Sequence, residues 1–406
     1  MLTYSYTARN PQTGKQVKAT VQADSEAAAA KLISAEGLVP TDVTLESSSP
    51  GMNFFKGRIK AKDRVLFSRQ LSTLINAGLP LLQALRSVNS QATSKPLKVV
   101  LSQVIGDVEG GGTLAAAMGK FPRVFNPVYI ALIAAGESSG TLDQALDRLA
   151  VQQEKEADLN AKIKGAMIYP LVVVLVMMAV VGFMVVKVLP QVKNIYDGMQ
   201  NAQLPLITRV LLSISDFTIH FWWVMLLALG FAIFFTTRWA RTGPGKEVID
   251  KLKMSAWPIG SLFMKVYMAR FARTGTTLVS TGVPLLQMLS ITSKAVNNVH
   301  IEKSIMRASE KVKGGKSLAD SLENDPHFLP LVPSMMRIGE QSGALEQMMT
   351  KVADYYEKEV DTEVETISSI IEPVMMVLLG IVAFIIVAAV LLPIYGLAGK
   401  NGLGGV

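Results

Sequence analysis

The segment that comes nearest to a known chemical motif is glycine-rich and reads GGGTLAAAMGK at residues 110–120. In a phosphate-binding loop, a Gly-x-x-x-x-Gly-Lys-Ser/Thr segment wraps its backbone N–H groups around the phosphates of a nucleotide. Here Leu114 stands where the first glycine of that motif belongs, and Phe121 stands where the Ser or Thr belongs. We therefore expect no nucleotide site.

Other residue types that carry chemistry are scarce. The chain has no cysteine, which excludes disulfides, thiolate metal sites and cysteine nucleophiles. Its histidines, His220, His300 and His327, lie far apart in sequence. Glu137 and Glu340 could bind a cation, although a solvated or helix-capping carboxylate is the more ordinary interpretation. We expect no enzyme activity, no catalytic residue, no cofactor and no metal site.

Three long apolar stretches set the class of the protein. Half of the residues are hydrophobic (50%) and the mean hydropathy is +0.35, which is high for a soluble chain. Residues 165–186, 217–237 and 373–399 contain no Asp, Glu, Lys or Arg, and about 20 apolar residues suffice to cross a bilayer. We predict three transmembrane helices, with kinks at Pro170 and Pro373. Spans without acidic residues also disfavour a membrane aspartyl protease and an ion-coupled transporter.

The distribution of Lys and Arg orients these spans. Cytoplasmic segments next to a span carry an excess of basic residues. The segment after the second span has five of them, whereas the loop between the first two spans has only Lys193 and Arg209. The five are Arg238, Arg241, Lys246, Lys251 and Lys253. This places the N-terminus in the cytoplasm and the C-terminus on the external, or periplasmic, side of the membrane. It also explains the net charge of +8 without nucleic-acid binding.

The strongest signal in the sequence is an internal repeat with an offset near 204. Residues 76–85 read NAGLPLLQAL and residues 280–289 read STGVPLLQML. With an offset of one residue less, GESSG at 136–140 matches GEQSG at 339–343, and Pro170 matches Pro373. Each repeat reads as a helical domain that runs into a span. The second span belongs to neither repeat and returns the chain to the cytoplasm, so that both domains lie on the same side.

Short helices joined by tight turns are predicted within each repeat. Phe67, Leu71 and Leu74 fall on one face of a first helix, Gly78 fits its C-terminal turn, and Pro80 opens the next helix. Residues 96–109 form a third helix, and Asn126 caps another. Thr141 and Gln144 have the spacing of a capping box for a last helix, which continues into the first span.

The first residues of the chain read differently. Residues 4–8 and 16–21 alternate like strands, Asp24 can cap a helix that ends near Ala35, and residues 39–45 suit a further strand. The start of the chain lacks the basic and apolar regions of a signal peptide. The Ser- and Pro-rich stretch that follows is a linker.

The predicted fold class is therefore a mostly α integral membrane protein. It has three transmembrane helices, two homologous cytoplasmic helical-bundle domains and a small N-terminal α+β module. The predicted layout is an N-terminal module (1–46), linker (47–60), cytoplasmic domain 1 (61–164), first span (165–189), external loop (190–216), second span (217–237), cytoplasmic domain 2 (238–372), third span (373–399) and external tail (400–406).

These residues together resemble the type II secretion system F-domain family, the inner-membrane platform proteins of type IV pili and type II secretion. In the first repeat the resemblance rests on FSRQL at 67–71, AGLPL at 77–81, GESSGTL at 136–142 and Tyr169-Pro170. In the second it rests on Arg273, GVPL at 282–285, residues 339–345 and Glu372-Pro373. The second repeat has Thr274-Gly275 where the first has Gln70-Leu71, which suggests that the two domains differ in partner contact.

The resemblance implies a platform without an active site. Its cytoplasmic domains would engage a hexameric ATPase, and ATP turnover would move the platform so that pilins or pseudopilins enter a filament. Other inner-membrane assembly proteins and further copies of the chain are implied as partners. The candidate partner-contact or structural residues are Arg69, Gly78, Pro80, Gly136, Glu137, Gly140, Arg273, Gly282, Pro284, Gly339, Glu340 and Gly343.

The alternatives stay open at this point. A type II secretion platform that drives a pseudopilus is the nearest one; no residue in the chain separates the two functions cleanly, and we prefer the pilus only modestly. A membrane transporter is a remote alternative, which flux in reconstituted vesicles would support.

Overall fold

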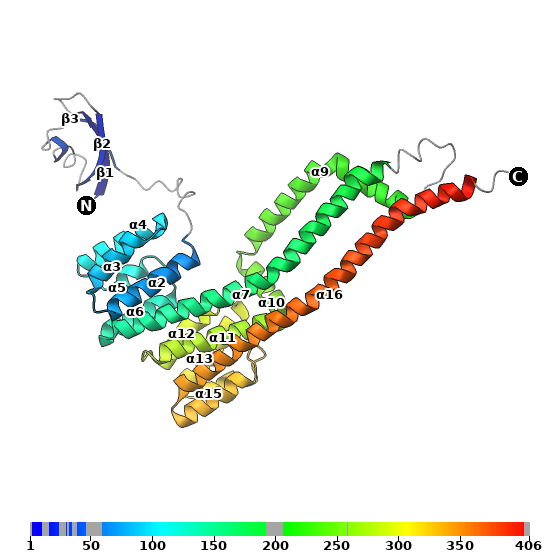
Figure 1. Cartoon of the computed structure of the whole chain (residues 1–406). Coiled ribbons are helices and arrows are strands. Elements are labelled where there is room, and N and C mark those ends of the chain that lie inside the picture. Colours follow the sequence, from blue (N-terminus) through cyan, green and yellow to red (C-terminus); the bar gives the residue numbers. More distant parts are fainter. Residues whose placement is uncertain are drawn as a thin grey trace. The chain divides into compact units, whose positions relative to one another are not determined.

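The computed structural model of the protein describes residues 2–9, 16–23, 30, 32–34, 39–45, 59–191, 206–257 and 259–401. The chain divides into two units, Met1–Arg58 and Ile59–Val406. Figure 1 shows the elements of each unit.

The N-terminal unit contains a three-stranded antiparallel sheet in the order β2-β1-β3. The strands are β1 (Leu2–Arg9), β2 (Gln16–Ala23) and β3 (Val39–Leu45). The register of β3 against β1 shifts between Thr7 and Ala8, where Pro40 pairs with Ala8. A proline donates no backbone hydrogen bond, and such a bulge is a usual place for it in a sheet. The predicted helix from Asp24 to Ala35 and the turn between β1 and β2 lie largely or wholly outside the described residues.

The second unit begins with the first helical domain. Its helices are α2 (Ala61–Asn76), α3 (Leu81–Gln91), α4 (Lys95–Glu109), α5 (Leu114–Gly119), α6 (Pro127–Ser139) and the start of α7 (Leu142–Phe183). Phe67 and Leu71, one helical turn apart on α2, are buried, as the predicted apolar face requires. Asn126 caps α6 as predicted, because its Oδ1 accepts a hydrogen bond from the N–H of Tyr129 at 2.8 Å.

A second helical domain repeats this order. Its helices are α10 (Gly243–Ser255), α11 (Ile259–Val279), α12 (Leu285–Ala295), α13 (Val299–Lys313), α14 (Leu318–Leu322), α15 (Leu331–Ser342) and the start of α16 (Leu345–Asn401). Helices α11 to α16 correspond to α2 to α7, so α11 is the first helix of the repeated domain and α10 is an addition that precedes it. The two domains share one continuous hydrophobic core, which includes Phe67 in the first and Phe271 in the second.

Within the described part of the chain, three helices are long and apolar enough to cross a membrane, which confirms that part of the predicted fold class. They are α7 with the short π-helical segment η2 (Met184–Val188), α9 (Leu206–Trp239), and α16. Helix α9 begins before the predicted span, so residues 206–216 of the predicted external loop are helical. There Leu212 is buried beside Leu189 and Val185.

Both predicted kink prolines lie inside helices that continue past them, Pro170 in α7 and Pro373 in α16. The irregular backbone within α9 is at Phe221, with φ −114° and ψ 20°, where no proline signals it. The kinks at Pro170 and Pro373 stay predictions.

The predicted capping box of α7 is wrong. Thr141 is the N-cap residue, but its side chain makes no capping hydrogen bond. Instead its hydroxyl lies 2.7 Å from the hydroxyl of Ser139. A local hydroxyl–hydroxyl contact across the turn thus takes the place of the bond to the helix N-terminus.

Candidate functional site

The predicted glycine and proline positions form matching turns in the two domains. Gly78 and Gly282 follow the first helix of each domain with φ of +82° and +76°, a conformation that favours glycine. Pro80 and Pro284 are the N-cap residues of α3 and α12, with nearly identical backbone angles. These four residues form the turns between helices, and this structural role accounts for them without a binding partner.

Gly136 and Gly339 are required by a close approach between helices. A Cβ atom at Gly136 would lie 2.5 Å from the Cβ of Ala145 on α7. At Gly339 it would lie 2.9 Å from the Cα of Leu345 on α16. Any larger side chain would push apart the two last helices of its domain, so these glycines hold α6 on α7 and α15 on α16. Gly140 and Gly343 end α6 and α15 with φ of +73° and +69°.

Glu137 and Glu340 cap neighbouring helices. The two carboxylate oxygens of Glu137 accept hydrogen bonds from the N–H groups of Leu114 and Ala115 at 2.5 and 2.9 Å. Those of Glu340 accept from Leu318 and Ala319 at 2.5 and 3.0 Å. A carboxylate at a helix N-terminus satisfies free donors and complements the helix dipole.

Glu137 caps the helix that follows the start of the glycine-rich segment. The N-terminus of α5, which follows Gly112 and Thr113, is where a phosphate would have to bind. The carboxylate of Glu137 occupies it, and Thr113 caps the same helix through its hydroxyl. The expectation that residues 110–120 bind no nucleotide therefore gains a physical reason that the sequence did not supply.

Residues 136–140 also have the Gly-x-Ser-x-Gly spacing of a nucleophile elbow. That motif needs a sharp turn from a strand to a helix, whereas Ser138 lies at the end of α6. Its hydroxyl donates a hydrogen bond to the carbonyl of Ala135 at 3.0 Å. The spacing here belongs to a helix terminus.

Arg69 and Arg273 join the first helix of each domain to the helix that enters the membrane. Arg69 on α2 contacts Glu154 and Asp147 on α7 at 2.5 and 3.1 Å. The hydrogen bond from Arg69 lowers the pKa of the Glu154 carboxyl below its ordinary value, against the opposing effect of partial burial. Arg273 on α11 contacts Glu357 and Asp354 on α16 at 2.7 and 2.5 Å. Both arginines thus have a structural partner within their own domain.

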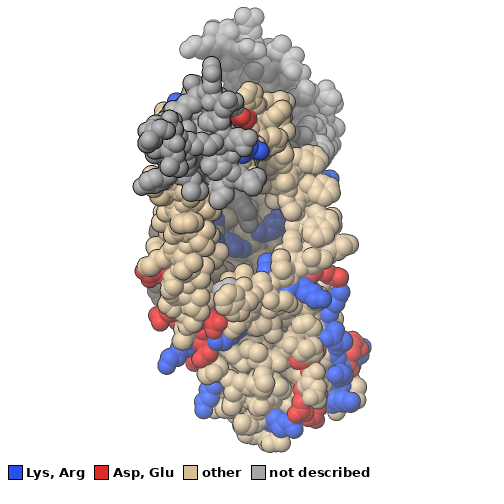
Figure 2. Space-filling model, turned by 90° about the vertical axis from the view of Figure 1, so that its right-hand side faces the viewer, with Lys and Arg blue, Asp and Glu red and all other residues tan. Residues whose placement is uncertain are grey.

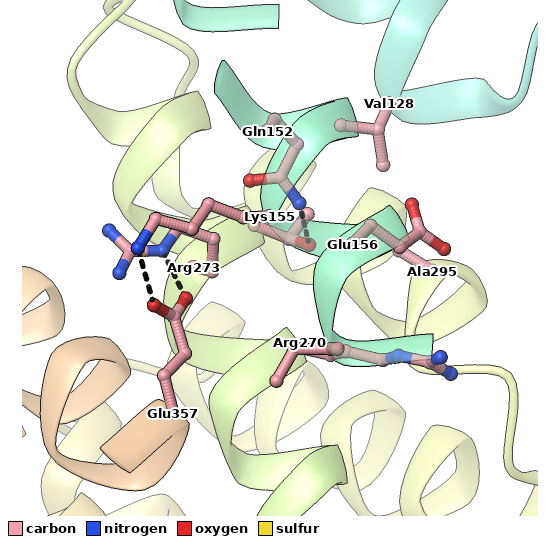
Figure 3. Close-up of a pocket in the computed structure, with 10 residues that line it drawn as sticks. Val128, Gln152, Lys155, Glu156, Arg270, Arg273, Ala295 and Glu357 are labelled. Atoms are coloured by element: carbon pink, nitrogen blue, oxygen red, sulfur yellow. Dashed lines mark hydrogen bonds and ion pairs between the residues drawn. The ribbon is translucent and has the colours of Figure 1, made fainter. Parts of the chain in front are cut away.

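The two domains meet at a polar contact that no candidate residue except Arg273 approaches. Gln152 of α7 lies between two threonines of α11, with its Nε2 at 3.5 Å from the Oγ1 of Thr274 and its Oε1 at 3.2 Å from that of Thr277. Lys155 contacts Glu357 at 3.2 Å. A small cavity of about 20 Å³ lies beside these groups, and Figure 3 shows Gln152, Lys155, Arg273 and Glu357 around it.

Two further ion pairs join α7 to α16 across this contact. Arg148 lies 3.8 Å from Glu346, and Lys162 lies 2.8 Å from Asp361. The departure at Thr274-Gly275 is thereby explained. Thr274 faces Gln152, and at Gly275 an added Cβ would lie 2.1 Å from the Cε of Met349, whose side chain fills that space.

The structure brings together two histidines that the sequence separates. The rings of His300 and His327 stack with their centroids 5.8 Å apart. Ser304 and Arg307 contact Asp325 beside them at 2.9 and 2.8 Å. Burial raises the pKa of Asp325, but hydrogen bonds from Arg307, His327 and Ser304 outweigh it, and the net shift is downward. Among the described residues no group of three His, Asp or Glu side chains is arranged to hold a metal ion.

Away from the helical domains the surface is apolar. In Figure 2, Lys, Arg, Asp and Glu gather over one end of the molecule, and uncharged residues cover most of the rest of the described surface. Leu175, Leu227 and Phe384, one from each long helix, are exposed by 59%, 66% and 73%. Exposed apolar side chains on this scale are expected of helices that lie in lipid.

Comparison with known proteins places these features in a family. The sequence model described as "Type II secretion system (T2SS), protein F" matches residues 67–190 and again residues 271–393. These are the two repeats, with the offset found in the sequence. The model described as "Type II secretion system protein F, N-terminal domain" matches residues 1–44.

Curated relatives cover almost the whole chain. A type IV pilus assembly protein PilC of Thermus thermophilus is 39% identical, with 98% of this chain and 99% of the relative aligned. A PilC of Myxococcus xanthus is 35% identical, over 96% of this chain and 93% of the relative. A type II secretion system protein F of Pseudomonas aeruginosa is 35% identical, over 98% and 99%. The duplicated helical domain, the matching turns and these alignments agree, and the chain belongs to the type II secretion system protein F family.

Proposed function

We propose that the chain is an inner-membrane platform on which a cytoplasmic hexameric ATPase acts to insert pilin subunits into a type IV pilus filament. The observation that carries the proposal is the continuity of α7 and α16. Each begins inside a helical domain, where an arginine ties it to the first helix of that domain, and continues unbroken into an apolar segment. Each domain therefore has one continuous helix that links its core to the membrane, α7 in the first domain and α16 in the second.

The proposed orientation places both helical domains in the cytoplasm and the C-terminus outside. It rests on Arg238, Arg241 and Lys246, which follow the apolar part of α9. Under this orientation the ATPase meets the helical domains directly, and α9 serves to return the chain to the cytoplasm.

The proposed ATPase contact includes the α6–α7 and α15–α16 turns. Glu137 and Glu340 themselves point into their domains as helix caps. Ser138 in the first turn and Gln341 in the second directly follow these glutamates and are exposed. Their side chains, unlike the two capping carboxylates, are available to a partner.

A pilus is favoured over a secretion pseudopilus by the relatives. The pilus assembly protein of Thermus thermophilus is more similar than the secretion protein of Pseudomonas aeruginosa, at 39% against 35% identity over the same 98% of the chain. The second candidate function is therefore a type II secretion platform.

A clean deletion strain tests the proposal. Sheared surface filaments and secreted proteins are compared in the parent, the deletion strain and the complemented strain. Lost filaments with normal secretion, restored by the gene, are the expected result. Retained pili with exoproteins trapped inside would assign the chain to secretion. No change in either, in a strain without another family member, would contradict a platform role.

The ATPase contact has a separate test. The ATPase should co-purify with the full-length chain, and Ser138→Arg combined with Gln341→Arg should reduce its yield. Ser102→Arg, at an exposed position of α4, is the matched control and should leave the yield unchanged. Equal yields for all three proteins would remove the two turns from the contact.

A further inference from the structure

The contact between the two helical domains joins two different surfaces. On the first domain, the surface consists of Val128 on α6 with Arg148, Gln152 and Lys155 on α7; we call it the α6–α7 face. On the second domain, it consists of residues from α11 and α16, namely Thr274, Thr277, Glu346 and Glu357. Because the domains are repeats of one another, each of these surfaces has a counterpart on the other domain, and neither counterpart takes part in the contact between the two domains.

The counterpart of the α6–α7 face is an open groove on the second domain. Leu331, Lys351, Tyr355 and Lys358 stand where Val128, Arg148, Gln152 and Lys155 stand in the first domain, at the same offset of 203. The first three of these line the groove, together with Met335 and Tyr356, and its volume is about 540 Å³. We call it the α15–α16 groove.

Exposure shows that one surface is covered and the other is not. Gln152 is 7% exposed because the second domain lies on it, whereas its counterpart Tyr355 is 49% exposed. The residues that follow them, Gln153 and Tyr356, are both buried, at 7% and 4%. The local fold is therefore the same, and the difference comes from the missing neighbour. A large aromatic side chain that stands half exposed in an apolar groove is characteristic of a docking surface.

The counterpart of the second surface is on the first domain, at α2 and α7. Gln70, Thr73, Asp143 and Glu154 stand where Thr274, Thr277, Glu346 and Glu357 stand in the second domain. Thr277 is 7% exposed, whereas Thr73 is exposed. Leu66, on the same side of α2, is 55% exposed. We call this surface the α2–α7 face.

Charges on the two unused surfaces are complementary in the same places as in the contact within the chain. Arg148 faces Glu346 within the chain, and the corresponding pair is Lys351 with Asp143. Lys155 faces Glu357 within the chain, and the corresponding pair is Lys358 with Glu154. The glutamate of the second pair also has the same neighbour in both domains. Arg273 forms an ion pair with Glu357, and Arg69 forms one with Glu154.

One pair does not carry over. Lys162 faces Asp361 within the chain, but the corresponding positions are occupied by Glu365 and Asp158. Asp158 is already neutralised by Lys162 of its own helix, at 3.0 Å. Two of three ion pairs are thus retained, together with the apolar groove and the polar side chains of α2.

We propose that a second copy of this chain docks on the α15–α16 groove with its α2–α7 face, head to tail, and thereby repeats the contact that joins the two domains within one chain. Such a contact is heterologous, and repetition of it gives a closed ring where the rotation closes. Helices α7 and α16 lie side by side and run in the same direction (Figure 1). Each further copy therefore keeps its membrane helices on the same side of the assembly.

The proposal is independent of which filament the platform serves, since it concerns only contacts between copies of the chain. The absence of cysteine makes it directly testable by cross-linking. One full-length copy carries Tyr355→Cys and a second, differently tagged copy carries Thr73→Cys. The two are co-expressed and oxidised in native membranes. A disulfide-linked product that bears both tags is expected.

The contact within the chain supplies the matched control. Gln152→Cys with Thr277→Cys in a single chain places thiols at the corresponding positions, where the native Gln152 Oε1 and Thr277 Oγ1 atoms lie 3.2 Å apart. This variant should form a disulfide within one chain, detected as a shift in gel mobility that a reductant reverses. If the control forms its disulfide but Tyr355→Cys and Thr73→Cys give no linked product, the proposal is overturned.

Two other results would also overturn it. If Tyr355→Cys alone forms a homodimer as efficiently as the mixed pair, the groove lies on a two-fold axis and the contact is not head to tail. If Tyr355→Cys links instead to a different protein, that protein occupies the groove.

Charge exchange provides a second measurement that does not require oxidation. Lys351→Glu should reduce the recovery of one tagged copy with the other several-fold, and Asp143→Lys in the same chain should restore it. Failure of the double variant to recover association, while each variant keeps its normal thermal unfolding, would contradict the head-to-tail pairing.

Discussion

Three equivalent core positions are filled differently in the two helical domains. The first domain has Leu71, Ala84 and Leu146, and the second has Gly275, Met288 and Met349. The five side chains that carry a Cβ are fully buried, with 0% exposure. Two long, flexible methionines in the second domain occupy the space that two leucines share in the first. The repeats thus conserve the volume of the core while the individual residues change, and a departure from the repeat pattern need not mark a functional site.

The same comparison on the surface gives the opposite lesson. Gln152 and Tyr355 stand at equivalent positions, and one is covered while the other is half exposed. Here the residue type differs because Gln152 is covered by the other domain, whereas Tyr355 is not. Matched substitutions in the two domains test where they are equivalent.

Placing the leucine of the first domain at Gly275 of the second, without further changes, should lower the free energy of unfolding the most. In Gly275→Leu the new Cβ would lie 2.1 Å from Met349 Cε and 3.0 Å from Met349 Sδ. Overpacking of this kind costs about 3 kcal/mol in the free energy of unfolding. The triple variant Gly275→Leu, Met288→Ala and Met349→Leu reproduces the first domain and should recover all but about 1 kcal/mol. Thermal unfolding in detergent measures both.

Gly106→Leu is the control for that experiment. Gly106 lies on α4 with no heavy atom within 4 Å of an added Cβ, so leucine should be tolerated there. A triple variant that is no more stable than Gly275→Leu would show that the two cores are not interchangeable.

Removal of a capping charge should have a smaller and equal effect in the two domains. Glu137→Gln and Glu340→Gln keep one acceptor oxygen but lose the second, together with the negative charge at the helix N-terminus. Each should cost about 1 kcal/mol, measured by thermal unfolding, with Ser138→Ala as the neutral neighbour. If either variant unfolds at the normal temperature but no longer co-purifies with the ATPase, that glutamate contacts the partner instead.

The arginine pair of the first domain should give the smallest effect, and one that depends on pH. The pKa of Glu154 is below its ordinary value of 4.5 because Arg69 donates a hydrogen bond to it. Near that pH the folded state therefore binds fewer protons than the unfolded state, so the pair stabilises the fold above about pH 4.5 and this contribution is lost as the pH falls through the lowered pKa. Because Glu154 is 41% exposed, solvent screening limits the contribution to about 0.5 kcal/mol.

Arg69→Met tests this by comparison of unfolding at pH 7 and at low pH. The difference in stability from the unmodified chain should shrink as the pH falls below 4.5. A difference that is constant with pH would mean that Arg69 acts through packing of its aliphatic part and not through its charge.

Much of the fold could be predicted from the sequence because the signals are local. Glycine at 78 and 140, proline at 80 and asparagine at 126 each act on neighbouring backbone, and each ends or begins a helix as predicted. The apolar spans need only length and composition. The repeat needed only comparison of the chain with itself.

The chemistry of the candidate site could not be predicted in the same way. Glu137 accepts hydrogen bonds from residues about 20 positions earlier in the chain, and no local pattern indicates that pairing. The capping box failed because the hydroxyl of Ser139 is a closer partner for Thr141. The stacked histidines and the contact of Gln152 with α11 arise only when separate helices pack.

Helix α16 has one mechanical consequence. It runs for 57 residues without interruption, which at about 1.5 Å per residue is a rod of about 85 Å. If such a rod pivots at its domain end by about 10°, its far end sweeps through about 15 Å, a distance of the order of half the thickness of the hydrocarbon layer. A modest rotation of a compact helical domain is thereby converted into a large displacement of the far end of the helix inside the bilayer.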